Sequence, residues 1–190
     1  LAAIAGKHYL DHAGLAEKAA PLFMRAFRFD PTTPDVFEYL ERCLKQIEDW
    51  DSLIQVYREA AEVAESDEER VGILRRAATV EEVRRGNIEA AIGLHREALE
   101  IDPAYEPSLE AVERLLSVGE RWEEVADHLR FQIDGAVDDD HRHDLQHRLA
   151  TLTLERLGDV DEAIRILEEV VVEAPTHAAS VATLERLVTD

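Results

Sequence analysis

Apolar residues recur along this chain at the three- and four-residue spacing that is typical of amphipathic helices. In the segment 88–101, Ala91, Leu94, Ala98 and Ile101 fall on one helical face. No segment shows the strict alternation of apolar and polar residues that indicates a half-buried strand. Glycine and proline lie mainly where the helical pattern stops, which indicates short joints between helices. The pattern predicts an all-α chain.

Four helices are predicted in the middle of the chain, over residues 67–85, 88–101, 105–118 and 122–134. Ser66 and Glu69 form a capping-box pattern before the first helix, and Gly86 is expected to end it. The second helix is expected to end before Pro103, because a residue that precedes proline avoids the helical region. Gly119 is expected to break the third helix. The same plan in the rest of the chain predicts eleven helices in total.

This plan repeats with a period of 72 residues. Glycines, prolines, arginines and tryptophans recur at that offset: Gly14, Gly86 and Gly158; Pro31, Pro103 and Pro175; Arg42, Arg114 and Arg186; Trp50 and Trp122. Self-similarity at a fixed period is the signature of a stacked repeat array. The sequence therefore predicts antiparallel helical hairpins that stack on one another.

The period also predicts how the chain is organised. We expect one repeat array over residues 1–190. It divides into a partial repeat that ends at Pro31, two double hairpins and a helix without a hairpin partner: 1–31, 32–103, 104–175 and 176–190. Because both ends of the sequence fall inside repeats, we interpret the chain as a fragment of a longer array.

The small and bulky positions of this repeat resemble the tetratricopeptide repeat, a helix–turn–helix of about 34 residues. The shared pattern is a turn with glycine, a small residue, a bulky residue, a second small residue and a closing proline. Its three copies are Gly14, Ala19, Phe23, Ala26 and Pro31; Gly86, Ala91, His95, Ala98 and Pro103; and Gly158, Ala163, Leu167, Val170 and Pro175. The resemblance covers the whole chain and implies a right-handed α–α superhelix, a solenoid of about eleven antiparallel helices.

The repeat departs from the regular form of that family in its length. Its period is 72 residues rather than twice 34, and the first helix before Gly86 and before Gly158 is expected to be longer by one residue. Val170 replaces one of the small alanines. We therefore expect a superhelical twist that differs from the regular one.

Composition narrows the classes of partner. Acidic residues outnumber basic ones 42 to 21, which gives a net charge of −21. Nucleic acids and anionic membranes both need a basic surface, so neither is expected as a partner. Acidic surface also keeps an exposed helical array soluble. No apolar run approaches the ~18 residues of a membrane span, and the location is expected to be cytoplasmic.

A partner-binding face follows from the resemblance. In the tetratricopeptide family the first helix of each hairpin lines a concave groove that holds an extended or helical peptide. Alignment with that pattern implies eight groove-facing residues: Glu38, Arg42, Arg75, Glu110, Arg114, His147, Thr151 and Arg186. Some members hold a terminal carboxylate with asparagines on these helices. Asn87, the single asparagine here, lies in a turn, so that role is not expected.

Arg42, Arg114 and Arg186 recur at one phase of the repeat, and guanidinium groups bind carboxylates in bidentate geometry. One hypothesis is an arginine ladder that binds carboxylates of a partner segment. The alternative is local pairing, because a glutamate precedes Arg42 and Arg114 by four residues. Arg186 has Ala182 at that position, so it separates the two hypotheses.

Other polar clusters favour structural roles. His8 with His12, and His143 with His147, form i,i+4 pairs that can place two imidazoles on a metal ion, and His141 lies close to the second pair. Neither pair recurs at the 72-residue offset or has the glutamate of an HExxH motif, so no metal or other cofactor is expected. Whether the second pair and its neighbour ever bind metal stays open.

The remaining chemistry-bearing residues are also assigned to packing. Recurrence of Trp50 and Trp122 at hairpin junctions favours packing over ligand stacking. Cys43 is the single cysteine, which excludes an intrachain disulfide, and it falls on an apolar stripe with Leu40 and Leu44. The run 138–140 is interpreted as a helix start, where carboxylates offset the helix dipole.

Function is predicted at the level of a class. No glycine-rich phosphate loop, nucleophile elbow or catalytic arrangement is present in the sequence, so no catalytic residue and no enzymatic activity are expected. Similar arrays occur in bacterial scaffold and complex-assembly proteins. We predict a protein–protein interaction scaffold that binds a peptide or helix of another protein. The alternative is a structural spacer that self-associates through open ends of the array.

Overall fold

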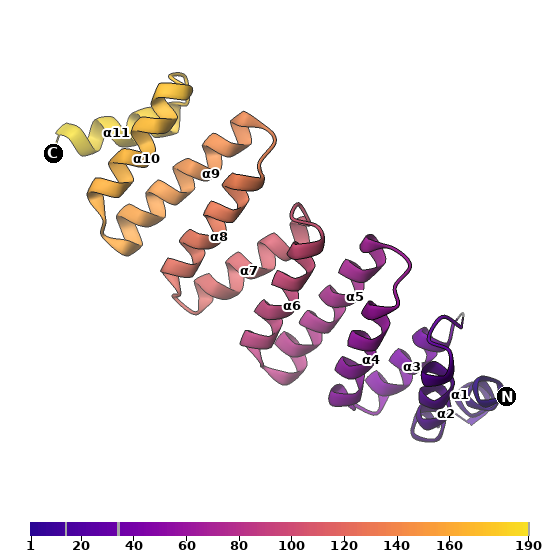
Figure 1. Ribbon diagram of the computed structural model, residues 1–190. Coiled ribbons are helices and arrows are strands. Elements are labelled where there is room, and N and C mark those ends of the chain that lie inside the picture. Colours follow the sequence, from indigo (N-terminus) through magenta and orange to yellow (C-terminus); the bar gives the residue numbers. More distant parts are fainter. Residues whose placement is uncertain (14, 34, 190) are drawn as a thin grey trace. The chain divides into compact units, whose positions relative to one another are not determined.

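The computed structural model describes residues 1–13, 15–33 and 35–189, which form eleven α-helices and no strand (Figure 1). The helices are α1 (Ala2–Ala13), α2 (Ala16–Phe29), α3 (Val36–Gln46), α4 (Trp50–Glu62), α5 (Asp67–Val80), α6 (Ile88–Ile101), α7 (Glu106–Val118), α8 (Trp122–Gly135), α9 (Asp139–Leu152), α10 (Val160–Glu173) and α11 (Ala178–Thr189). The prediction of an all-α chain with eleven helices is confirmed. Gly14 of the repeat pattern lies outside the described residues.

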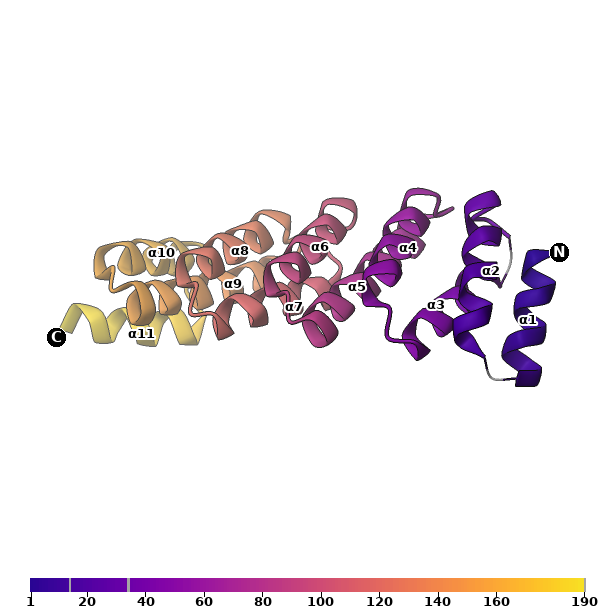
Figure 2. The ribbon, with the colours of Figure 1, turned by 90° about the horizontal axis from the view of Figure 1, so that it is seen from below.

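The chain divides into two compact units, residues 1–108 and 109–190, with the division inside α7. In the first unit, α1 to α6 pack in chain order, each helix against its predecessor (Figures 1 and 2). In the second unit, α9 packs against α8, α10 against α9, and α11 against α10. Each unit is therefore a stack of neighbouring hairpins.

Several helices begin at a side-chain cap, as the sequence pattern indicates. The Ser66 hydroxyl accepts from the Glu69 amide at 3.1 Å, and the Glu69 carboxylate accepts from the Glu65 amide at 3.0 Å. A capping box would place the Glu69 carboxylate on the Ser66 amide. The carboxylate instead accepts from the amide of the preceding residue, Glu65. Asp138 caps α9 by accepting from the His141 amide at 2.8 Å, which agrees with a helix start at this acidic run.

Small residues are buried at one recurring position of the repeat, and one glycine lies at a close contact between two helices. Three alanines that share one repeat position are fully buried: Ala19, Ala91 and Ala163. At the first hairpin, a Cβ atom added to Gly6 on α1 would lie 2.9 Å from the Phe23 ring on α2. Real Cβ atoms do not approach that closely, so the small residue is what allows the two helices to meet.

Side chains at the bulky position and at the second small position of the repeat are also buried, with one exception. Phe23, His95, Leu167, Ala98 and Val170 are buried. Ala26 at the equivalent place is partly buried. Val170 therefore fits where an alanine stands in the preceding copy, without losing burial.

Cys43 belongs to the core of the first unit. Its side chain is fully buried together with Leu40 and Leu44, as the apolar stripe predicts. Burial raises the pKa of the Cys43 thiol, an effect that the positive charge of Arg42 opposes. A buried thiol with a raised pKa is a packing residue and a poor nucleophile.

The first helix of two hairpins ends in a wide turn. Beyond α5 the π-helical turn η1 (Glu81–Arg85) follows directly, and beyond α9 the turn η2 (Thr153–Leu157) does the same. A π-turn accommodates one more residue than an α-turn. Gly86 and Gly158 follow in the left-handed conformation, with φ of +64° and +72°. These turns therefore contain the extra residue that the 72-residue period predicts.

The same backbone bond closes each wide turn. It runs from the Asn87 amide to the Glu81 carbonyl (2.9 Å) and from the Asp159 amide to the Thr153 carbonyl (3.1 Å). The Leu15 amide and the Tyr9 carbonyl form a corresponding bond of 3.2 Å, 72 residues before Asn87. The period is thus visible in main-chain geometry as well as in side chains.

Helix α7 breaks at Gly119 as the sequence predicts, but the glycine does not take the left-handed conformation. Helix α7 ends at Val118 as predicted, but the left-handed residue after it is Glu120, with φ of +53°. Glu48 occupies the equivalent place after α3, with φ of +57°. At both ends the helix closes with a Schellman-type bond, from Arg121 to Leu116 and from Asp49 to Leu44, each 3.0 Å. A glutamate, rather than the glycine beside it, therefore takes the strained conformation.

We expect Glu120→Gly to stabilise the protein. Glycine adopts the left-handed region without the cost of roughly 1–2 kcal/mol that a side chain incurs there. Glycine also has greater conformational entropy in the unfolded chain, which opposes this gain. We therefore expect the free energy of unfolding to rise by about 0.5–1 kcal/mol. Urea unfolding followed by circular dichroism measures it. Glu110→Gly is the matched control, because Glu110 is an exposed interior residue of α7, and it should cost about 1 kcal/mol. A lower midpoint for Glu120→Gly would contradict the strain.

Enlarging the buried alanines should destabilise the hairpins. We expect Ala91→Leu and Ala163→Leu each to lower the free energy of unfolding by about 1–3 kcal/mol, because extra methylenes in a close helix contact force the backbones apart. The control is Ala182→Leu on α11, whose site is exposed and should change stability by less than about 0.5 kcal/mol. Equal melting temperatures for all three variants and the wild type would show that these alanines make no close contact.

Candidate partner-binding surface

The eight residues implied to bind a partner all lie on the odd-numbered helices, which open the hairpins. In the first unit they are Glu38 and Arg42 on α3 and Arg75 on α5; in the second they are Glu110 and Arg114 on α7, His147 and Thr151 on α9, and Arg186 on α11. Six of these side chains are exposed, whereas His147 and Thr151 are partly buried. Within each unit, the first helices of the hairpins therefore present charged side chains to solvent.

The local pairing that the alternative hypothesis assigns to Arg42 does not form among the described residues. Among the residues that the structure describes, Arg42 and Arg186 make no ion pair, although Glu38 lies one helical turn before Arg42. Both guanidinium groups are exposed. They remain available for a carboxylate from outside the chain.

A buried carboxylate that sequence reasoning missed lies behind this face in the first unit. Glu41 on α3 is only 8% exposed and accepts from Lys45 Nζ (2.6 Å), Tyr57 Oη (2.6 Å) and Arg76 Nη1 (2.8 Å). Burial acts to raise the pKa of this carboxyl, but the three partners together hold it below its ordinary value. Burial and the bond to Glu41 raise the pKa of Tyr57. The ion pair joins α3 to α5.

The second unit contains the same link. The Glu113 carboxylate on α7 accepts from the Arg148 guanidinium on α9, and these residues lie 72 positions after Glu41 and Arg76. The repeat register could have identified this pair, because a glutamate and an arginine recur together at a constant separation of 35 residues. Successive first helices are thus connected by one repeated ion pair within each unit.

The tryptophans pack at hairpin junctions and carry an arginine on their rings. The Arg84 guanidinium lies 5.3 Å from the Trp50 ring centroid, and that of Arg156 lies 4.7 Å from the Trp122 centroid. Both arginines belong to the wide π-turns. A cation above an aromatic face is attracted to the ring electrons. The stack recurs at the 72-residue offset, which agrees with packing at these junctions.

A cavity on the first unit is lined mainly by basic and aromatic side chains. It has a volume of about 410 Å³ and lies between α4 and α5 beside the end of α3. Four cationic and two aromatic side chains line it: Lys45, Arg75, Arg76, Arg84, Trp50 and Tyr57. Of these six residues, Arg75 is one that the resemblance implies to face the groove. The sequence interpretation did not place the other five at a binding surface.

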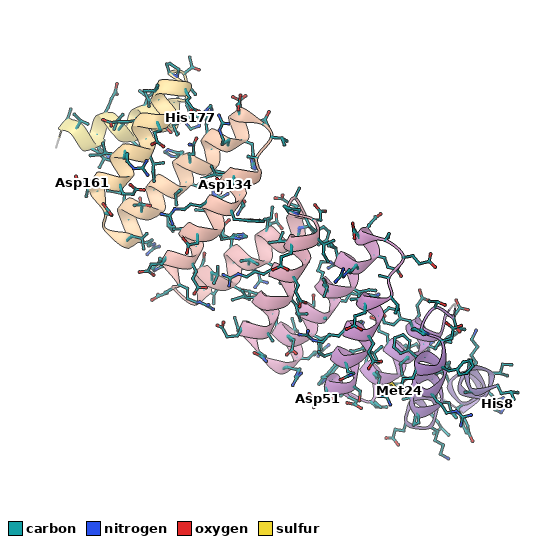
Figure 3. All side chains as sticks on the ribbon, in the orientation of Figure 1. His8, Met24, Asp51, Asp134, Asp161 and His177 are labelled. Atoms are coloured by element: carbon teal, nitrogen blue, oxygen red, sulfur yellow. The ribbon has the colours of Figure 1, made fainter. Side chains whose placement is uncertain are left out.

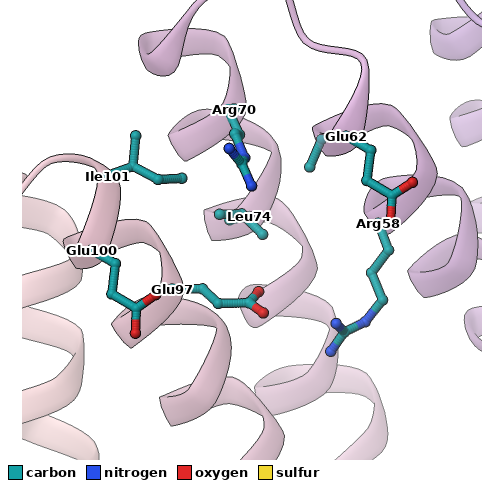
Figure 4. A pocket seen from close by; sticks show the side chains of 8 residues that line it. Arg58, Glu62, Arg70, Leu74, Glu97, Glu100 and Ile101 are labelled. Carbon is teal, nitrogen blue, oxygen red and sulfur yellow. The ribbon is translucent and has the colours of Figure 1, made fainter.

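A smaller cavity of mixed charge opens elsewhere on the first unit. It has a volume of about 240 Å³ and is formed by α4, α5 and α6 (Figure 4). Its wall contains Arg58, Arg70, Glu62, Glu97 and Glu100. Because three carboxylates accompany two arginines, this cavity has no excess of positive charge.

The histidines of α9 lie against the start of α11. The Ser180 hydroxyl lies 2.8 Å from His177 Nδ1 and 3.3 Å from His147 Nδ1, and the two rings are 5.8 Å apart. His177, labelled in Figure 3, also contacts the Asp144 carboxylate through Nε2 at 3.0 Å. His143 lies 3.2 Å from Glu173 on α10. These contacts hold the last described helix against its neighbours.

Burial lowers the pKa of His147, and the positive charge of His177 adds to that effect against the opposing charge of Asp144. Among the residues that the structure describes, no group of three or more histidine, cysteine, aspartate or glutamate side chains is arranged to hold a metal ion. His8 is exposed, and the side chain of His12 lies outside the described part of the chain. None of the described helices has both the length and the apolar character needed to cross a membrane.

Comparisons with known proteins identify the fold. Residues 39–71 match a family model described as the tetratricopeptide repeat. No curated protein matches the chain. Among solved structures, a chain in the complex of Naa15/Naa10 bound to HypK-THB is 17% identical, with a TM-score of 0.55 over 95% of this chain and 27% of that one.

Two further structures are similar over most of the chain. A tetratricopeptide repeat protein from Parabacteroides merdae is 15% identical, with a TM-score of 0.48 over 98% of this chain and 70% of that one. YrrB, described as a TPR protein with an unusual peptide-binding site, is 12% identical, with a TM-score of 0.44 over 93% and 87%. At such identities a likeness concerns the fold alone.

Stability should depend on pH through His147. Because its pKa is lowered in the folded state, the unfolded chain binds more protons as the pH falls below the ordinary histidine pKa of about 6.5. Stability is therefore lost on acidification through that value. We expect thermal unfolding at about pH 5.5 to occur at a lower temperature than at about pH 7.5, and His147→Gln to reduce the difference.

His141→Gln is the control, because the His141 side chain is exposed on the same helix. Glu41 and Glu173 have lowered pKa values, so their losses of stability come at more acidic pH and do not overlap this window. An unchanged pH difference in His147→Gln would contradict the assignment.

Proposed function

Because the chain is a tetratricopeptide-repeat-like helical repeat protein, we propose that it is a protein–protein interaction scaffold. It binds a peptide or helix of a partner on the face formed by the first helices of its hairpins. Proteins of this fold are generally interaction scaffolds and are typically not enzymes. Stacked repeats expose an extended surface, which suits recognition of a long segment rather than a small substrate.

The observation that carries this proposal is the exposure of charged side chains on the odd-numbered helices. Arg42 and Arg186 are exposed and, among the described residues, make no ion pair. A guanidinium group that is not committed within the fold can form two parallel bonds to a carboxylate. Such groups on the predicted binding helices support recognition of a partner that carries carboxylates.

A second candidate function is self-association. The first two helices expose large apolar side chains, with Ile4 71% and Phe29 91% exposed. Leu1 and Phe29 line a cavity of about 330 Å³ between these helices and the turn after α2. Apolar surface of this kind favours contact with another protein surface. In this alternative, copies of the chain associate through that end and no dedicated peptide is bound.

A random-peptide display selection separates the two functions. We expect the wild type to enrich peptides, and Arg42→Glu/Arg114→Glu/Arg186→Glu to bind the enriched peptides about tenfold more weakly or worse, because each reversal replaces an attraction with a repulsion. Binding is measured by fluorescence anisotropy, and thermal unfolding checks that each variant is folded.

The matched control is Arg25→Glu/Arg28→Glu/Arg58→Glu. These arginines are exposed on the even-numbered helices α2 and α4, and the net-charge change is the same. Equal weakening by both triple variants would contradict a specific surface. No enrichment, with a mass that rises with protein concentration in light scattering, would favour self-association instead.

A further inference from the structure

The basic cavity of the first unit stands out in a chain with a net charge of −21. Its lining includes Lys45, Arg75, Arg76 and Arg84 and no carboxylate. The Glu41 carboxylate, which bonds to the lining residues Lys45 and Arg76, is buried. A concentration of positive charge on an acidic protein marks a place where an anionic group is favoured.

Two of these cations are not neutralised within the fold. Among the described residues, Arg75 and Arg84 make no ion pair. Arg84 is held over the Trp50 ring, 5.3 Å from its centroid, so its guanidinium is oriented before a ligand arrives. Orientation in advance reduces the entropy that is lost on binding. This pair of arginines is therefore suited to receive carboxylates.

The cavity also offers apolar contact. Val83 lines it and is 63% exposed, beside the partly buried Trp50. Tryptophan and arginine are the residue types that most often dominate the energy of protein interfaces. A ligand that combines carboxylates with a neighbouring apolar side chain therefore fits this cavity better than a small inorganic anion.

The second unit shows which of these features the fold itself requires. At the 72-residue offset the tryptophan, its stacked arginine and the arginine of the buried ion pair all recur, as Trp122, Arg156 and Arg148. Three other lining residues do not recur: Ser117, His147 and Glu155 stand at the positions of Lys45, Arg75 and Val83. The second unit thus forms without these three residues. Lys45 bonds to Glu41 in the first unit, whereas Arg75 makes no ion pair among the described residues and Val83 is exposed, which makes Arg75 and Val83 candidates for binding.

We propose that this cavity binds an acidic segment of a partner protein. Arg75 and Arg84 receive its carboxylates, and Trp50 and Val83 contact an adjacent apolar side chain. The inference rests on the proposed scaffold function and names the chemistry of the segment that is bound. The excess of negative charge on the rest of the chain opposes nucleic acid as the source of the anionic group.

The tryptophans provide an internal comparison. We would titrate the ¹⁵N-labelled chain with a blocked peptide of alternating Asp and Leu and follow both indole N–H signals by NMR. The expected result is a saturable shift of the Trp50 signal with little change at Trp122. The same peptide with Asn in place of Asp is the neutral probe and should bind about tenfold more weakly or worse.

Substitutions on α5 test whether Arg75 binds the peptide. Arg75→Glu should raise the Kd about tenfold or more. The control Arg70→Glu lies on the same helix and changes the net charge equally, but lines the mixed-charge cavity shown in Figure 4. It should change the Kd by less than about twofold. Arg75→His, which introduces the residue type that stands at position 147, is a second variant compatible with the repeat and should weaken binding as well.

Several results would overturn the inference. Equal binding of the neutral peptide would show a groove without carboxylate recognition and would leave the scaffold function standing. Equal shifts at both tryptophans, or equal weakening by Arg70→Glu, would show diffuse electrostatic attraction. Inorganic phosphate that displaces the peptide at comparable concentration would assign the cavity to a small anion. A Trp50 shift on concentrating the protein alone would assign it to a second copy of the chain.

Absence of any shift with either peptide would also overturn the acidic-segment assignment. It would not overturn the scaffold function, because that function is tested by display selection with substitutions at Arg42, Arg114 and Arg186. None of those three residues lines the basic cavity. The two proposals can therefore fail separately.

Discussion

Close approach of the paired helices is the constraint on which this structure depends. Ala19, Ala91 and Ala163 are fully buried, and the space beside Gly6 is already filled by the Phe23 ring. Small residues at these points let two backbones meet, and the larger side chains around them then fill the core at normal packing density. The hairpins, and through them the exposed face of their first helices, follow from that contact.

A polar framework is superimposed on this packing and recurs with the same period. The Glu41–Arg76 pair returns as Glu113–Arg148, and the stack of Arg84 on Trp50 returns as Arg156 on Trp122. Because these interactions occur in both units, they belong to the architecture. Some residues beside these repeated interactions differ between the two units. Under the proposed function, those residues give each unit its own binding properties. This distinction separates Arg75 from Arg76, although the two are neighbours in sequence and line the same cavity.

Much of the fold could be predicted because the signals are local. Apolar spacing, caps and the proline after α6 set the helices to within a residue or two, and the excess length of the repeat indicated an extra residue before Gly86 and Gly158. The break at Gly119 was predicted correctly, but the residue that takes the left-handed conformation is Glu120, for a physical reason. The Schellman geometry requires the left-handed conformation at a fixed distance from the last helical carbonyl, and that position falls on Glu120 whatever residue precedes it.

The sequence by itself determined the helices, the 72-residue period and the class of fold, because each is encoded in residues close in the chain or repeated along it. Only the tertiary structure decided which charged groups are committed and which are free to bind. Glu41 and Glu38 are both glutamates on α3, yet one is buried among three partners and the other is exposed. That difference depends on which face of a helix meets α4 and α5. Burial and long-range pairing are therefore properties of the packed hairpins rather than of any single segment.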